Sequence, residues 1–197
     1  MNQTQDFTKG VIWKQLLFFF FPILIGSFFQ QLYNTVDTII VGQAVGTSAL
    51  AAVGSTGNLT NLIVNFYVGL STGASVVIAQ YYGAQNNKKI HQAVHTSYIL
   101  AIVSGILMML FGLFFSYQCL DAIGTPHDIL NDATLYMQLY FLCMIPGAIY
   151  NIGAGILRAV GDSKRPLYYL IVCSIVNVVF DFIFVVIFHQ GIAGAAI

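Results

Sequence analysis

The stretch from Lys14 to Ile40 reads KQLLFFFFPILIGSFFQQLYNTVDTII and decides the fold class. After Lys14 its only charged side chain is Asp37. About 20 mostly apolar residues are enough for an α-helix to cross the hydrocarbon core of a bilayer. This stretch is longer than that, so it predicts a transmembrane helix.

Four further stretches have the same apolar character. The predicted spans are residues 14–40, 50–80, 93–116, 132–157 and 166–188, and a sixth helix is expected to start at 191. Charged residues make up 7% of the chain, against roughly 25% in a soluble domain. The sequence therefore predicts an all-α, polytopic membrane protein with five transmembrane helices and the start of a sixth.

The positive charges follow the predicted spans. They are Lys9, Lys14, Lys88, Lys89, Arg158, Lys164 and Arg165. Alternate crossing places all seven on one side of the membrane, whereas the loops near 41–49, 117–131 and 189–191 hold none. Cytoplasmic loops are enriched in Lys and Arg, so we expect a cytoplasmic amino terminus. The expected location is the plasma membrane, which in a bacterium is the inner membrane.

Several classes of function are disfavoured by composition. The formal net charge is +0, and a nucleic-acid partner would need a clustered basic face. The three cysteines and four histidines are scattered and form no metal-ligand motif. No nucleophile elbow or phosphate loop occurs. We therefore expect neither an enzyme nor a bound cofactor.

Two carboxylates fall inside predicted spans. Asp37 comes 23 residues after Lys14, about 35 Å along a straight helix. Asp181 comes 15 residues after Pro166, about 22 Å into the fifth span. Asn177 lies one turn from Asp181 on the same helical face. Two carboxylates and an amide are thus expected at comparable depth.

Burying an Asp at the centre of a membrane helix costs on the order of 2.5–3.5 kcal/mol. Such a cost is offset by a wet cavity, a shared proton or a bound cation. The alternative is that Asp37 and Asp181 simply reach the outer headgroups, although seven apolar residues, 182–188, follow Asp181.

Other polar side chains also lie inside spans. Asn58, Asn61 and Asn65 recur at steps of three or four residues and share one face of the second span, so we expect them to line a cavity or face protein. Tyr140 on the fourth span is a further candidate for a cavity wall. Tyr136 is assigned instead to the interfacial aromatic belt.

Five motifs, in order and spacing, resemble one known family, the multidrug and toxic compound extrusion (MATE) transporters. The motifs are QLYNTVDTIIVG at 31–42, AQYYGAQN at 79–86, LRAVGDSKRP at 157–166, NVVFD at 177–181 and GIAGAA at 191–196. The resemblance covers nearly the whole chain.

This resemblance implies two six-helix lobes around a central cavity, and exchange of an extruded lipophilic or cationic compound for Na⁺ or H⁺. It places the cation site of the amino-terminal lobe on Asp37, Asn177 and Asp181, with no other metal expected. It also implies that Pro22, which removes a backbone hydrogen bond, bends the first helix.

The departure from the family is length, because members have about twelve helices. Residues 1–197 are therefore expected to form an amino-terminal lobe that lacks its carboxyl-terminal partner lobe and is inactive alone.

Two alternatives remain. A lipid-linked oligosaccharide flippase of the same superfamily would need several basic residues inside the lobe to hold a pyrophosphate, and none lies within a predicted span. A truncated membrane protein without transport activity is favoured only by the length.

Overall fold

The computed structural model describes residues 11–188, 191 and 194, and this part of the chain contains helices and turns but no strand. The helices are α1 (Ile12–Ala44), α2 (Thr47–Gly83), α3 (Asn87–Ala122), α4 (His127–Leu142), α5 (Met144–Ala159) and α6 (Lys164–Asp181), followed by the π-helix η1 (Phe182–Ile187). Four long apolar helices can each cross a membrane, and α4 with α5 is a bent pair that gives a fifth span if the two helices cross together. The predicted all-α polytopic class is confirmed.

The sequence predicted the fourth span as one continuous helix, but the structure has two helices there. The break lies at Cys143, and the axis of α5 is bent by 51° away from that of α4. Pro146 explains the break, because it has no N–H to donate to the carbonyl of Leu142 and its ring crowds that carbonyl. In α5 the same proline occupies the first turn, where backbone N–H groups lack intrahelical acceptors anyway.

By contrast, α1 continues through Pro22 without a break. The bend expected there is therefore still a prediction about the working protein. Most of the predicted sixth helix lies outside the described residues.

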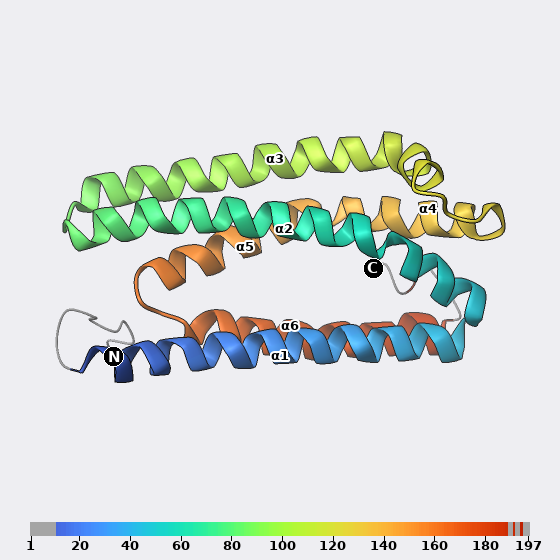
Figure 1. Cartoon of the computed structure of the whole chain (residues 1–197), viewed down its shortest axis with the longest axis horizontal. Helices are drawn as coiled ribbons and strands as arrows, with labels where there is room; N and C mark the ends of the chain where they lie inside the picture. The colour runs from blue at the N-terminus through green and yellow to red at the C-terminus, as the bar shows by residue number, and fades with distance from the viewer. Residues whose placement is uncertain (1–10, 189–190, 192–193, 195–197) are drawn as a thin grey trace.

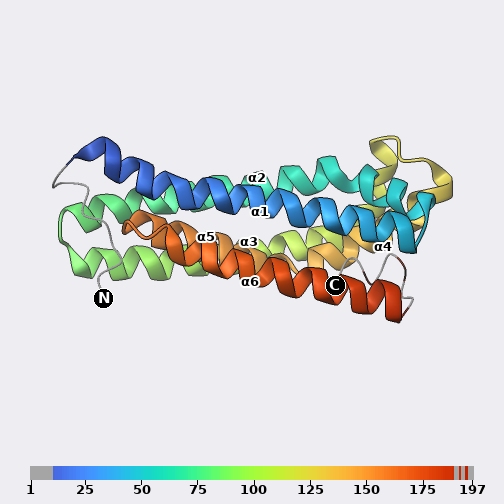
Figure 2. The ribbon, with the colours of Figure 1, turned by 90° about the horizontal axis from the view of Figure 1, so that it is seen from below.

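The helices form two groups. α1 and α6 run side by side, while α2, α3, α4 and α5 pack together as a second group (Figures 1 and 2). The hydrophobic core lies mainly within the second group and includes Ile63, Ala101, Leu120, Met137 and Ile152.

Small residues allow close packing in the second group. Gly155 on α5 leaves no room for a Cβ beside the hydroxyl groups of Ser71 and Ser75 on α2. Ser71 Oγ donates a hydrogen bond of 2.6 Å to the backbone oxygen of Asn151. Such close backbone approach is the usual basis of helix association in membranes.

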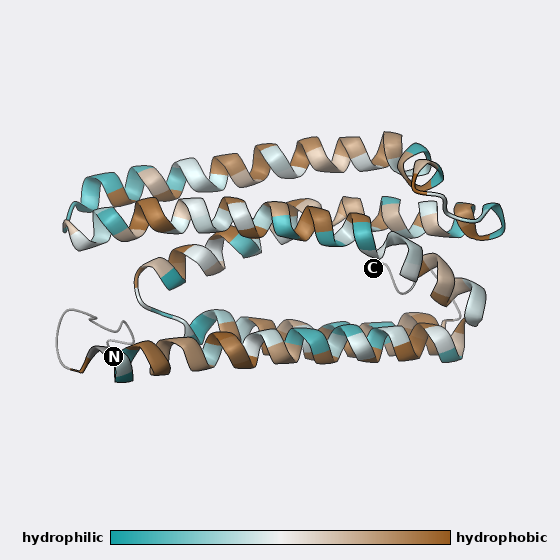
Figure 3. Cartoon of the chain, viewed as in Figure 1, coloured by the Kyte–Doolittle hydropathy of each residue, from teal (hydrophilic) through white to brown (hydrophobic). Residues whose placement is uncertain are grey.

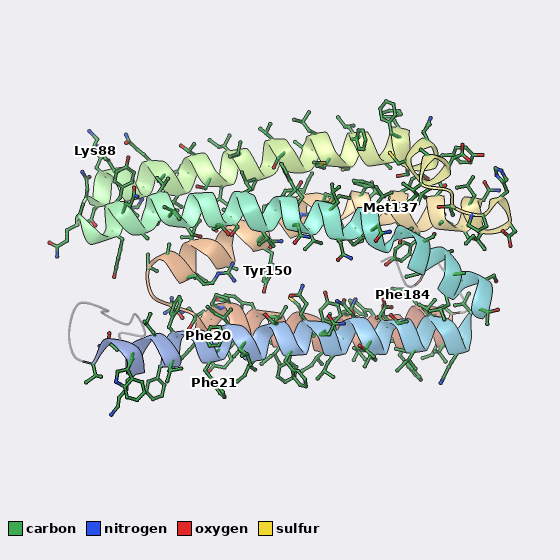
Figure 4. The ribbon with its side chains drawn as sticks, in the orientation of Figure 1. Phe20, Phe21, Lys88, Met137, Tyr150 and Phe184 are labelled. Carbon is green, nitrogen blue, oxygen red and sulfur yellow. The ribbon has the colours of Figure 1, made fainter. Side chains whose placement is uncertain are left out.

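The outer surface is strongly apolar. Large side chains such as Phe18, Phe21, Leu107 and Phe114 are more than half exposed, and apolar residues occupy much of the length of α1 and α3 (Figure 3). Hydrophilic residues gather at the connected ends of α2 and α3, where Lys88 lies (Figure 4), and further hydrophilic segments lie along α1 and α2 (Figure 3). This distribution suits a surface that faces lipid.

Candidate cation site

The two carboxylates predicted to bind a cation lie on the α1–α6 pair. Asp37 is in the carboxyl-terminal part of α1 and is half-buried, whereas Asp181 ends α6 and is 2% exposed. Asn177 is half-buried one turn before Asp181. The chain changes from α- to π-helix directly after Asp181, and π-turns are frequent at functional sites.

All three residues carry a buried oxygen that lacks a hydrogen-bond partner among the described residues. The atoms are Oδ1 of Asp37, Oδ1 of Asn177 and Oδ2 of Asp181. A buried polar atom without a partner costs about 1–3 kcal/mol, so such atoms are rare in proteins. Unsatisfied acceptor oxygens on neighbouring helices are the groups that a proton or a hard cation would satisfy.

The carboxyl groups of Asp37 and Asp181 are close enough to interact electrostatically. Within the described residues, neither forms an ion pair with Lys or Arg; the one ion pair there joins Arg165 to Asp162. Two like charges in a poorly solvated site repel each other. A shared proton or a bound cation would remove this repulsion.

Two tyrosines that the sequence analysis did not assign here approach the carboxylates. Tyr136 on α4 lies within electrostatic range of both Asp37 and Asp181, and so does Tyr33 on α1. Tyr136 also packs against the hydrophobic core, and its assignment to the interfacial belt is still a prediction. The sequence contained a signal that Tyr33 is near the site, because Tyr33 lies one helical turn before Asp37.

Tyr140 lies near Tyr33 and packs against the core. It therefore belongs to the same aromatic surroundings of the site, where the sequence analysis placed a cavity wall.

The polar stripe of α2 is not part of this group. Asn58, Asn61 and Asn65 are exposed, and the described residues supply no hydrogen bond to their side chains. In a bilayer such groups need water or another protein surface.

No cluster of three or more His, Cys, Asp or Glu side chains that could hold a metal ion occurs in the described part of the chain. The donor set of Asp37, Asn177 and Asp181 is two carboxylates and one amide.

The sequence analysis placed Arg158 in a loop between two spans. α5 extends to Ala159, so Arg158 lies inside the helix, not in a loop, and is half-buried. Like Lys14, Lys88, Lys89, Lys164 and Arg165, Arg158 lies near the end of its helix.

A multi-pass helical bundle with carboxylates buried between its helices is typical of membrane transporters. The MatE family model matches residues 22–183. The chain belongs to this family.

Two similar proteins have names that are consistent with this family. The chain is 31% identical over 175 residues to "Probable multidrug resistance protein YoeA" of Bacillus subtilis (strain 168), covering 89% of this chain and 38% of that protein. It is 30% identical over 191 residues to "Probable multidrug resistance protein YpnP" of the same organism, covering 97% and 43%.

Among solved structures, "Crystal structure of MATE in the straight conformation" matches with a TM-score of 0.86 and 29% identity, covering 93% of this chain and 40% of that one. The chain therefore spans about two fifths of the length of these relatives.

Proposed function

We propose that this chain is the amino-terminal lobe of a secondary antiporter that extrudes lipophilic or cationic compounds in exchange for H⁺ or Na⁺. Support comes from its family, from relatives named for multidrug resistance, and above all from the three unsatisfied buried oxygens of Asp37, Asn177 and Asp181.

The site would couple cation binding to helix position. Asp37 belongs to α1 and Asp181 to α6, so their repulsion acts between two helices. A proton or Na⁺ removes the repulsion and favours a closer arrangement of the pair, and a ligand shifts a conformational equilibrium by this kind of differential affinity. Tyr136 on α4 would transmit the change to the second group of helices.

The first test replaces each carboxylate in the transporter assembled with its carboxyl-terminal lobe. Asp37→Asn and Asp181→Asn should each abolish efflux driven by an ion gradient in proteoliposomes, because the amide keeps the shape but cannot exchange a proton or carry the charge. Membrane insertion should be unchanged or improved, since an amide is cheaper to bury. Asn177→Ala should weaken cation affinity without abolishing coupling.

Asp128→Asn is the matched control, because Asp128 is exposed in the first turn of α4. It should leave efflux unchanged. Normal gradient-dependent efflux in both Asp37→Asn and Asp181→Asn would contradict the proposed site.

A second test addresses the missing lobe. Residues 1–197 expressed alone should confer no drug resistance, because alternating access needs an opposing repeat to rock against. Expression together with a matching carboxyl-terminal lobe should restore resistance. Efflux by residues 1–197 alone in proteoliposomes would instead indicate an assembly of identical copies.

A further inference from the structure

Arg158 is a charged side chain that the proposed cation site does not use. It is half-buried in the last turn of α5. It has neither an ion pair nor a hydrogen bond to any described residue. Arg residues in membrane helices are rare, costly and usually functional.

Packing places Arg158 short of the end of the neighbouring helix α2. Gly155 lies level with Ser71 and Ser75 of α2, because a Cβ there would meet both hydroxyl groups. α2 continues to Gly83, and each helical residue adds 1.5 Å. Arg158 is therefore recessed by about 10 Å from the end of α2.

Asp162, the acidic residue nearest to Arg158 along the chain, forms no ion pair with it. Asp162 Oδ1 accepts hydrogen bonds of 3.1 Å from the backbone N–H groups of Lys164 and Arg165. Its Oδ2 pairs with Nε of Arg165 at 3.1 Å. Asp162 is thus held by the start of α6, although its Oδ2 forms no hydrogen bond within the described part of the chain.

The surroundings of Arg158 point toward the α1–α6 pair. Long helical side chains lean toward the helix amino terminus, which directs Arg158 toward Tyr150, and the two interact electrostatically. Tyr150 in turn interacts with Cys173 on α6 and Tyr33 on α1, and Figure 4 shows it extending from α5 toward that pair.

We propose that Arg158 binds a phosphate-bearing anion that enters from the Lys- and Arg-rich end of the molecule, with the Tyr150 hydroxyl facing the same site. The planar guanidinium donates paired hydrogen bonds that match phosphate oxygens, and a bound anion offsets the cost of the recessed charge. The phosphate belongs to a lipid headgroup or to a soluble compound. This site is separate from the carboxylates and does not depend on their role.

The experiment uses the unaltered chain in uncharged detergent. Arg158 and Arg165 are the only arginines, so phenylglyoxal modification of each can be followed by mass spectrometry. Phosphatidylglycerol micelles and inorganic pyrophosphate are the two probes, and phosphatidylcholine is the uncharged-lipid control. At about ten times its dissociation constant, at least one probe should slow modification of Arg158 about tenfold, because only the unoccupied fraction reacts, while Arg165 reacts at its usual rate.

Protection by phosphatidylglycerol alone assigns the phosphate to a lipid, and protection by pyrophosphate assigns it to a soluble compound. Arg158→Gln should weaken binding of the protecting probe about tenfold, whereas Lys164→Gln, an exposed residue at the same end, should change it less than twofold. Equal modification of Arg158 with and without either probe would overturn the proposal, and this measurement needs no variant to fold.

Discussion

Gly112 on α3 has only a hydrogen atom as its side chain, and this allows α3 and α4 to lie close together. A Cβ built on Gly112 would overlap the ring of Phe141 on α4, and Phe141 is 4% exposed. Ser116 one turn further donates its hydroxyl hydrogen bond back to the Gly112 carbonyl. The α3–α4 contact therefore depends on Gly112.

Gly112→Ala should destabilise the chain by about 1–3 kcal/mol, the usual cost of overpacking a core. Thermal unfolding in detergent, followed by circular dichroism, measures the change. Phe141→Leu should recover part of the loss in the double variant because it removes ring atoms at the overlap.

Gly73→Ala is the control, since a Cβ there has no neighbour within 4 Å. If Gly112→Ala and Gly73→Ala both unfold at the same temperature as the unaltered chain, the Phe141 ring moves aside freely. The α3–α4 contact would then not depend on Gly112.

Among the elements, α4 and α5 show that the same residue type acts differently in two helices. Pro22 lies inside a continuous α1, while Pro146 follows a break. The 51° angle between α4 and α5 lets α5 pack against both α2 and α3.

Pro146→Ala restores the missing N–H donor and should straighten the α4–α5 span. Spin labels on Asp128→Cys and Leu157→Cys, in a background without the native cysteines, report the end-to-end distance by pulsed electron paramagnetic resonance. From 1.5 Å per residue and the observed angle, full straightening lengthens this distance by about 4 Å.

An unchanged distance would mean that packing of α5 against α2 and α3, and not Pro146, sets the bend. Pro22→Ala with the same label pair is the matched control and should leave the distance unaltered, because Pro22 lies in another helix.

For the whole molecule, the orientation in the membrane is still a prediction from the positive charges. A membrane-impermeant maleimide should label Lys88→Cys and Lys164→Cys only from the cytoplasm, and Asp128→Cys only from outside, because positively charged loops stay on the cytoplasmic side. Labelling of right-side-out and inverted vesicles, in a cysteine-free background, measures this. The opposite pattern would reverse the orientation and with it the side from which an anion reaches Arg158.

Much of the fold could be predicted from the sequence. The apolar spans and their number follow from the requirement that a membrane helix satisfy its own backbone hydrogen bonds, and this requirement acts along a local stretch of chain. The cost of burying charge likewise singled out Asp37, Asn177 and Asp181, whose oxygens the structure leaves without partners.

Only the tertiary structure showed that Tyr136 approaches both carboxylates, that the fourth span bends at Cys143, and that Arg158 is recessed beside Tyr150. These features depend on which helix faces meet. In a bilayer, lipid and apolar side chains are nearly equivalent neighbours, so hydrophobic pattern does not select the partner face. Close packing at small residues such as Gly112 and Gly155 selects it, and that fit exists only between helices in three dimensions.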